Sequence, residues 1–225
     1  MPGRISMGNI SFVFEDDFIK YKNMFERYCP PPLNVKKGTD LCRQCYTSDW
    51  MYYLADGIAK VYMTNYDGND RIIDFMKKNT LIGMDCVIPT LKSVVSISCV
   101  TDIHVLPFNA DILKKMLEED PEFAYDLVLY YGKVLRQVTY HSGNLGISNL
   151  TARFANFLYL FTDTPEYREK GRISMTQEEI AASINISRAQ VAKMCGQMRG
   201  EGIIETGNRS IVIKDLGKLR NYCHL

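Results

Sequence analysis

Residues 175–213 read MTQEEIAASINISRAQVAKMCGQMRGEGIIETGNRSIVI, and this stretch decides the fold of the C-terminal part of the chain. Thr176 and Glu179 have the spacing of a capping box, in which the hydroxyl accepts from a first-turn N–H and the carboxylate reaches back. Ser187 and Gln190 repeat that spacing a few residues later. The stretch therefore predicts two short helices joined by a tight turn.

Apolar residues recur at helical spacing after each capping box. They are Ile180, Ala181 and Ile184 in the first helix, and Val191, Met194, Cys195 and Met198 in the second. Gly202 ends the second helix, and two apolar strands follow around Gly207-Asn208. Helix, turn, helix and hairpin are typical of a winged helix-turn-helix, whose second helix enters the major groove of DNA.

Composition limits the class of protein. The 225 residues suit one or two domains, and the net charge of +1 gives no general attraction to polyanions. The placement of basic side chains in the winged helix must therefore matter more than their total. The sequence has no apolar run typical of a secretory signal or a membrane span. Seven cysteines without an export signal favour reduced thiols, so we expect a cytoplasmic protein with no membrane partner.

Residues 33–108 change to short alternating runs between turn signals, which predicts a β-barrel or jelly roll. Within them, residues 50–63 (WMYYLADGIAKVYM) predict a hairpin around Asp56-Gly57, and Asp67-Gly68 predicts a second tight turn. A helix is predicted over residues 15–29, and Pro30 follows it directly.

Residues 121–145 predict one long helix with an apolar seam at the spacing of a coiled coil. The seam consists of Leu127, Tyr131, Val134, Val138, His141 and Leu145. It favours a parallel homodimer, and the alternative is a single amphipathic helix packed on its own barrel. Another helix is predicted from Ser148 to Phe161, and a polar loop over residues 162–170.

The predicted fold class is α+β. We expect a sensing β-barrel with flanking helices over residues 1–120, a dimerisation helix and hinge over 121–147, and a winged helix-turn-helix over 148–225.

This order of elements resembles the cyclic-AMP receptor/fumarate-nitrate reduction regulator (Crp/Fnr) family. The resemblance covers nearly the whole chain, and its most specific stretches are residues 175–204, MYYLADGIAKVYM and NTLIGMD. It implies a homodimeric transcription regulator of the cytoplasm, with a cyclic-nucleotide-binding-like domain. In the family, an effector bound between the barrel and the dimer helix reorients the DNA-binding domains. An inverted-repeat operator and a second copy of the chain are the implied partners, and RNA polymerase is a candidate partner.

The resemblance also assigns DNA-contacting residues. The family pattern Ser-Arg-Glu-x-Val is matched by Ser187, Arg188, Ala189, Gln190 and Val191. Arg188 matches the arginine that reads a guanine, whereas Ala189 replaces the glutamate that accepts from a cytosine. Gln190 is a candidate for an adenine edge, or else only caps its helix. Ser187 and Lys193 are candidates for phosphates, and Arg209 and Thr176 are further candidate DNA contacts.

The same family holds a cyclic nucleotide with a Gly-Glu pair followed by Arg-Ser. This chain has Gly83-Met84-Asp85 and then Lys92-Ser93. The acid is displaced by one position, and lysine lacks the two-pronged geometry of arginine on a phosphate. We therefore expect an effector other than cyclic AMP.

Two effector classes remain. Tyr130, Lys133, Gln137 and Tyr140 form a second stripe of the long helix. Its aromatic groups and ammonium suit a small organic or aromatic anion. This stripe resembles that of the family branch that senses chlorinated aromatic acids. The alternative is redox or metal sensing by the Cys42-Arg43-Gln44-Cys45 pair. A lone CxxC makes Cys42 and Cys45 weak candidates for metal ligands, and we assign no cofactor.

Catalysis is not expected. His104, His141 and His224 are scattered among barrel, helix and tail, with no nucleophile–base set. A further alternative is an interaction adaptor that uses the winged helix without DNA, because that region is nearly neutral.

Overall fold

The computed structural model describes residues 13–145, 149–162 and 164–223. These residues form two compact units, one spanning Val13–Gly132 and the other beginning at Lys133. The boundary falls inside the long helix α3 (Pro121–Leu145), whose limits are those predicted from sequence. The division into a sensing barrel (residues 1–120, the sensor), a dimerisation helix (121–147) and a winged helix-turn-helix (148–225, the reader) stays a prediction.

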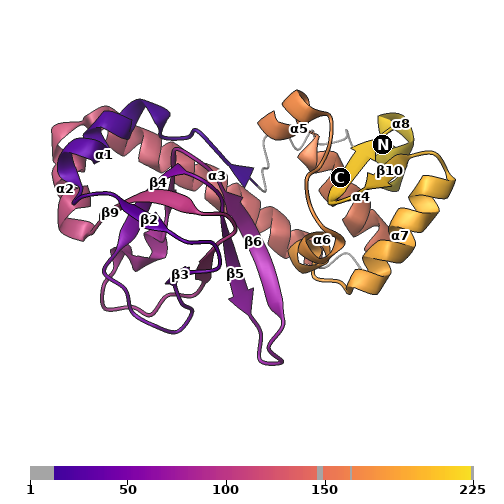
Figure 1. Cartoon of the computed structure of the whole chain (residues 1–225), viewed down its shortest axis with the longest axis horizontal. Coiled ribbons are helices and arrows are strands. Elements are labelled where there is room, and N and C mark those ends of the chain that lie inside the picture. The colour runs from indigo at the N-terminus through magenta and orange to yellow at the C-terminus, as the bar shows by residue number, and fades with distance from the viewer. Residues whose placement is uncertain (1–12, 146–148, 163, 224–225) are drawn as a thin grey trace. The chain divides into compact units, whose positions relative to one another are not determined.

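The first unit contains two sheets (Figure 1). One has the strand order β1-β6-β5-β8-β3 and the other β2-β9-β4-β7. Strands β1 and β6 pair in parallel, and the other strand pairs within the described residues of this unit are antiparallel. Their bounds are β1 Val13–Phe14, β2 Leu33–Val35, β3 Asp40–Cys42, β4 Met51–Asp56, β5 Ala59–Thr64, β6 Asp70–Met76, β7 Thr80–Ile82, β8 Ser96–Cys99 and β9 Ile103–Phe108. Tyr53, Leu54, Ile97 and Phe108 are fully buried in this unit. The α+β class with an N-terminal jelly roll is confirmed.

The predicted hairpin around Asp56-Gly57 is wrong. Strand β4 pairs with β7 and β9, whereas β5 pairs with β6 and β8, so the turn passes the chain from one sheet to the other. Gly57 has φ +94°, and a Cβ there would lie 2.6 Å from the Asp102 carbonyl oxygen. The Asp-Gly signal marks a true turn, but turn chemistry does not determine which strands pair. Asp67-Gly68 does join a hairpin, β5 with β6.

The first helix is shorter than predicted. A 3₁₀ turn (η1, Ile19–Tyr21) precedes α1, which spans Lys22–Tyr28. Residues before it are held by the β6–β7 connection, because the Asp16 and Phe18 N–H groups donate to the Lys78 and Asn79 carbonyls over 2.9 and 2.8 Å. The Asn79 amide also donates to the Asp16 carboxylate over 2.6 Å. These long-range bonds hold residues 16–18 in a bend and a turn, with Asp16 at φ 60°, so the helix begins only after them. Helical periodicity does not reveal this constraint.

The second unit contains a winged helix (Figure 1). Its elements beyond α3 are α4 Leu150–Phe161, α5 Pro165–Lys170, α6 Gln177–Ile184, α7 Arg188–Gly200, β10 Ile204–Gly207, β11 Ser210–Ile213 and α8 Leu216–Tyr222. The short helix α5 replaces a predicted polar loop. It forms because the Thr164 hydroxyl caps it by accepting from the Tyr167 N–H, and Gly171 ends it at φ 63°.

The remaining elements of the first unit are the 3₁₀ turn η2 (Met84–Val87) and helix α2 (Ala110–Glu119). Among the described residues, every helix is too short or too polar to serve as a membrane span.

Candidate nucleic-acid interface and effector loop

Both predicted capping boxes are present. The Thr176 hydroxyl accepts from the Glu179 N–H over 3.1 Å, and the Thr176 N–H donates to the Glu179 carboxylate over 2.7 Å. At α7, the Ser187 hydroxyl accepts from the Gln190 N–H over 3.2 Å, and the Ser187 N–H donates to Gln190 Oε1 over 2.8 Å. The predicted apolar stripes of both helices are buried. The helix-turn-helix is therefore stabilised by its two capping boxes and by the burial of its apolar stripes.

The turn between α6 and α7 has one support that the sequence did not reveal. Asn185 ends α6 in the left-handed region at φ 54°, which asparagine tolerates better than most residues. The Arg153 guanidinium of α4 donates to the carbonyls of Ile184 and Asn185 over 2.9 and 3.3 Å. A cation on the last carbonyls of α6 stabilises the end of that helix. Arg153 thereby ties α4 to the turn that precedes α7.

The exposed side of α7 begins with the predicted contact residues. Arg188, Ala189, Gln190 and Lys193 are all exposed, and so is the cap residue Ser187. Ser187 and Gln190 are already hydrogen-bonded to each other's backbone, so a DNA contact by either must coexist with the cap or replace it.

Arg188 is paired with an acid of the preceding helix. Its Nε lies 2.7 Å from Glu178 Oε1, and both side chains are more than half exposed. Neither the family pattern nor helical periodicity predicts this contact, because the two residues belong to different helices. An exposed pair of this kind contributes about 0–1 kcal/mol, so a stronger acceptor can displace Glu178.

The wing closes a groove beside Arg188. Arg209 lies in the turn between β10 and β11 at φ 51°, and its Nη2 is 3.4 Å from Glu179 Oε1. A groove of about 280 Å³ lies between the wing and the start of α6. Its lining includes Thr176, Glu178, Arg188, Asn208 and Arg209. Three of the predicted DNA contacts thus line one groove of the second unit.

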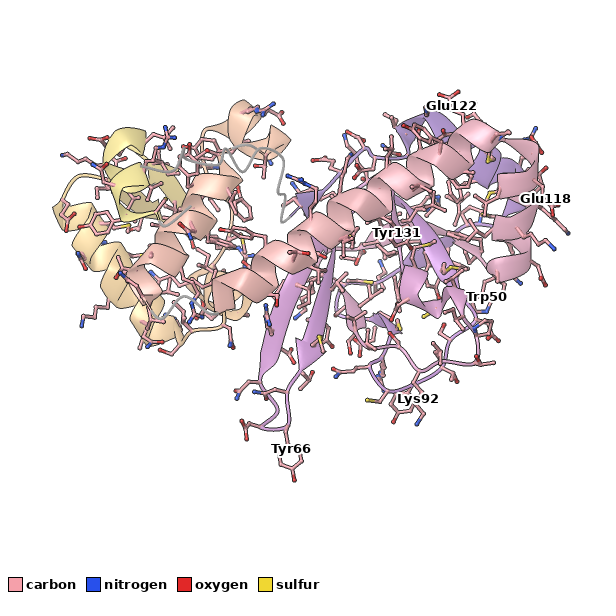
Figure 2. All side chains as sticks on the ribbon, turned by 180° about the vertical axis from the view of Figure 1, so that it is seen from behind. Trp50, Tyr66, Lys92, Glu118, Glu122 and Tyr131 are labelled. Atoms are coloured by element: carbon pink, nitrogen blue, oxygen red, sulfur yellow. The ribbon has the colours of Figure 1, made fainter. Side chains whose placement is uncertain are left out.

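The predicted effector loop lies in the first unit. Gly83 takes φ 78° and begins η2, which contains Met84 and Asp85. The Asp85 carboxylate accepts from the Ser93 hydroxyl and, over 3.2 Å, from the Val94 N–H. Ser93 is buried, whereas Lys92 is exposed on the loop (Figure 2). The chain's own carboxylate therefore occupies two of the donors that this loop offers to an anion.

The two adjacent tyrosines of the long helix, Tyr130 and Tyr131, lie in different environments. Tyr130 is buried against Phe14 and Phe18, with its hydroxyl 3.4 Å from the Leu81 carbonyl. Tyr131 is 39% exposed, and burial together with the charge of Asp85 raises its pKa to about 12. The charge of Asp85 thus acts on Tyr131, whose position on α3 is labelled in Figure 2. Lys133 is exposed.

The cysteines are arranged differently from the CxxC hypothesis. Cys42 is buried with its Sγ 3.7 Å from the Sγ of Cys86, whereas Cys45 is exposed at a left-handed φ of 69°. In the part of the chain that the structure describes, no group of three or more His, Cys, Asp or Glu side chains is placed to hold a metal ion. The metal alternative therefore lacks a ligand set among those residues.

The exposed apolar face of α3 only partly coincides with the predicted seam. Tyr131 and Val138 are exposed at 39% and 48%, but Leu127 and Val134 are half-buried. The side chains of His141 and Leu145 lie outside the described residues. Val128 and Leu135 are each 67% exposed, so the stripe Val128–Tyr131–Leu135–Val138 keeps the 3-4-3 spacing of a coiled coil.

A cavity of about 500 Å³ lies between α1 and β9, and none of the predicted effector residues lines it.

Comparison with known proteins identifies the protein family to which the chain belongs. Residues 32–120 match the model of the cyclic nucleotide-binding domain, and residues 152–222 match that of the Crp-like helix-turn-helix domain. Regulators that join these two domains bind DNA and respond to effectors. The chain belongs to the Crp/Fnr family of transcription regulators. It is a DNA-binding transcription regulator with an effector-binding domain.

Individual relatives differ in the effector that their names give. The CRP-like cAMP-activated global transcriptional regulator of Mycobacterium tuberculosis is 21% identical, over 84% of this chain and 86% of its own. The c-di-GMP responsive regulator CLP of Xanthomonas campestris is 14% identical, with a TM-score of 0.76 over 88% of this chain and 99% of its own. CprK complexed with OCPA is 16% identical, with a TM-score of 0.74 over 96% and 99%. Structures this distant show the fold alone.

Proposed function

We propose that this chain is a homodimeric regulator of the cytoplasm that reads an inverted-repeat operator with α7. Its effector is a small organic or aromatic anion other than cyclic AMP. The three-part division at residues 120 and 147 belongs to this proposal, as does the absence of catalysis. RNA polymerase remains a candidate partner.

The observation that carries the effector class is the position of Asp85. A cyclic phosphate bound at this loop would need the Ser93 hydroxyl and the neighbouring backbone N–H, and the Asp85 carboxylate accepts from both groups. A second anion at the same donors would meet a like charge at short range, which is unfavourable where the groups are partly desolvated. Lys92, the residue in the family's arginine position, is exposed and can offer only a point charge.

An aromatic anion can avoid this conflict. Its ring can pack on Tyr131, and a hydroxyl on the ring can donate to Asp85, so the acid becomes a partner instead of an obstacle. Lys133 stays the cation that the sequence predicts for the effector, and its side chain is exposed. This arrangement replaces Tyr130 by Tyr131 as the aromatic contact, because Tyr130 is already packed in the core.

Thermal unfolding tests the proposal. The purified chain is heated with millimolar phenylacetate, hydroxyphenylacetate, acetate or cyclic AMP. We expect the hydroxylated aromatic acid to raise Tm most, since a ligand that binds only the folded state stabilises it by mass action. Lys133→Ala should remove this shift while DNA affinity without effector stays unchanged, and Lys114→Ala on α2 is the control. A Tm shift by cyclic AMP at micromolar concentration would contradict the proposal.

DNA binding is tested separately. Duplexes selected from a random pool should contain an inverted repeat and should bind one dimer, with affinity that falls as salt rises. Selection of no duplex would favour the adaptor alternative.

A further inference from the structure

The structure brings together two thiols that are 44 residues apart in the sequence. Cys42 is the last residue of β3, and Cys86 lies in η2, yet their Sγ atoms are 3.7 Å apart. The two side chains are only 5% and 2% exposed. A disulfide would require the sulfurs to approach by about 1.7 Å, to the usual bond length of about 2 Å.

The two thiols are not chemically equivalent. The hydrogen bond from Cys86 lowers the pKa of Cys42, because it stabilises a thiolate there, and the Ser93 hydroxyl acts in the same direction. The same contact and burial raise the pKa of Cys86. Burial raises the pKa of Cys195 and of Cys223 to about 11. The first proton lost from the pair therefore leaves the nucleophile on Cys42 and a protonated resolving thiol beside it.

The pair is connected to the effector loop on both sides. On the η2 side, Asp85 precedes Cys86 and accepts from the Ser93 hydroxyl and the Val94 N–H. On the β3 side, the Cys45 N–H donates to the Ser93 carbonyl over 2.8 Å, and the Ser93 N–H donates to the Tyr46 carbonyl over 2.9 Å. A bond between Cys42 and Cys86 would therefore change the position of Asp85 relative to its two donors.

We propose that Cys42 and Cys86 are a thiol-oxidation site of the sensor domain and form a reversible intramolecular disulfide when a small hydroperoxide reaches them. This site differs from the CxxC pair and does not depend on the identity of the effector.

The reaction balances with hydrogen peroxide as the oxidant. The Cys42 thiolate attacks one peroxide oxygen, the O–O bond breaks, and hydroxide leaves and takes a proton to become water. Cys42 is then a sulfenic acid. Cys86 loses its proton and its sulfur attacks the Cys42 sulfur, so the S–O bond breaks and a second water leaves. One peroxide thus converts two thiols into a disulfide and two waters, and a small dithiol reverses the change by exchange.

Peptide mapping of the wild-type chain provides the test. The full chain is exposed to stoichiometric hydrogen peroxide, its remaining thiols are blocked, and its peptides are analysed by mass spectrometry. We expect a cross-link between the Cys42 and Cys86 peptides, with a mass lower by two hydrogens, that dithiothreitol removes. The rate of formation should rise with pH, as the thiolate fraction of Cys42 rises.

Single substitutions assign the roles. Cys86→Ala should stop the cross-link and leave Cys42 as a sulfenic acid that dimedone traps. Cys45→Ala is the matched control, because it removes the exposed member of the CxxC pair, and it should leave the cross-link unchanged. Two results with the wild-type chain would overturn the proposal. One is a Cys42–Cys45 disulfide. The other is that Cys42 and Cys86 both still react with the thiol-blocking reagent after a peroxide exposure that has oxidised Cys45.

Discussion

Arg188 Nε lies 2.7 Å from Glu178 Oε1, so the arginine in the family's guanine-reading position is paired with an acid of its own reader. Glu178 is the second residue of α6, after Gln177. The pair occupies Nε, so a bidentate base contact that uses Nε requires the pair to open, and any contact through the Nη groups must be made with the guanidinium held near Glu178. Glu178 thus competes with the operator for Arg188.

Glu178→Gln should tighten binding to the operator. The substitution removes the competing carboxylate and a negative charge near phosphates, and an exposed pair contributes up to about 1 kcal/mol, or about fivefold in Kd. A fluorescence titration with labelled operator duplex at two salt concentrations measures the Kd of the variant and of the wild-type chain. The control is Glu118→Gln on α2, which removes an equal charge at a position distant in sequence from the winged helix. It should leave the Kd for the operator unchanged. Weaker binding by Glu178→Gln would instead make Glu178 a DNA contact.

Arg188→Ala should weaken binding to the selected operator by about 1–3 kcal/mol, because a bidentate base contact is lost. Binding to random duplex of the same length should change much less. Electrophoretic competition between the two duplexes measures the ratio. If both affinities fall equally, Arg188 contacts a phosphate and carries no sequence preference.

Val138→Asp should convert the dimer to a monomer, because two like charges would face each other across a parallel seam. Multi-angle light scattering reports the mass directly. Leu135→Asp should have the same effect, since that side chain is 67% exposed on the same face. Val138→Thr keeps the shape without the charge and should stay dimeric. An unchanged mass for both aspartate variants would exclude α3 as the dimer contact.

Gly57→Ala should destabilise the sensor more than Gly68→Ala. Both glycines have a left-handed φ, +94° and +80°, which costs a residue with a Cβ about 1–2 kcal/mol. Only at Gly57 would the new methyl group also lie 2.6 Å from a backbone oxygen, while nothing lies within 4 Å at Gly68. Thermal unfolding should show a Tm that falls by about 2–4 °C per kcal/mol. Equal shifts in the two variants would mean that the Gly57 turn relaxes.

The elements that could be predicted from the sequence are those that depend on residues close together in the chain. The two capping boxes and the buried stripes of α6 and α7 depend on residues three or four positions apart, so the sequence alone predicts them. The limits of α3 follow from the same kind of pattern. The sheet crossing at Gly57 and the non-helical segment before α1 depend on distant partners, and both were predicted wrongly.

The same distinction applies to the sites. The exposed residues of α7 follow from helical spacing, but their pairing with Glu178 joins two helices. A CxxC motif is visible in the sequence, whereas the actual neighbour of Cys42 is Cys86. Tyr130 and Tyr131 are adjacent in the sequence, and only tertiary packing shows that the first is buried and the second half-exposed.

The separation of β4 and β5 into different sheets has a consequence for synthesis of the chain. The β5–β6 hairpin can form as soon as Met76 has been made, but β4 pairs with β7 and β9, and β2 pairs with β9. Strands β2 and β4 therefore wait for Phe108 before the sheet that contains them can close. At about 5–20 residues per second this leaves an unpaired apolar strand for several seconds on each nascent chain. We therefore expect the sensor to complete its fold later than the β10–β11 wing, whose two strands are neighbours in the sequence.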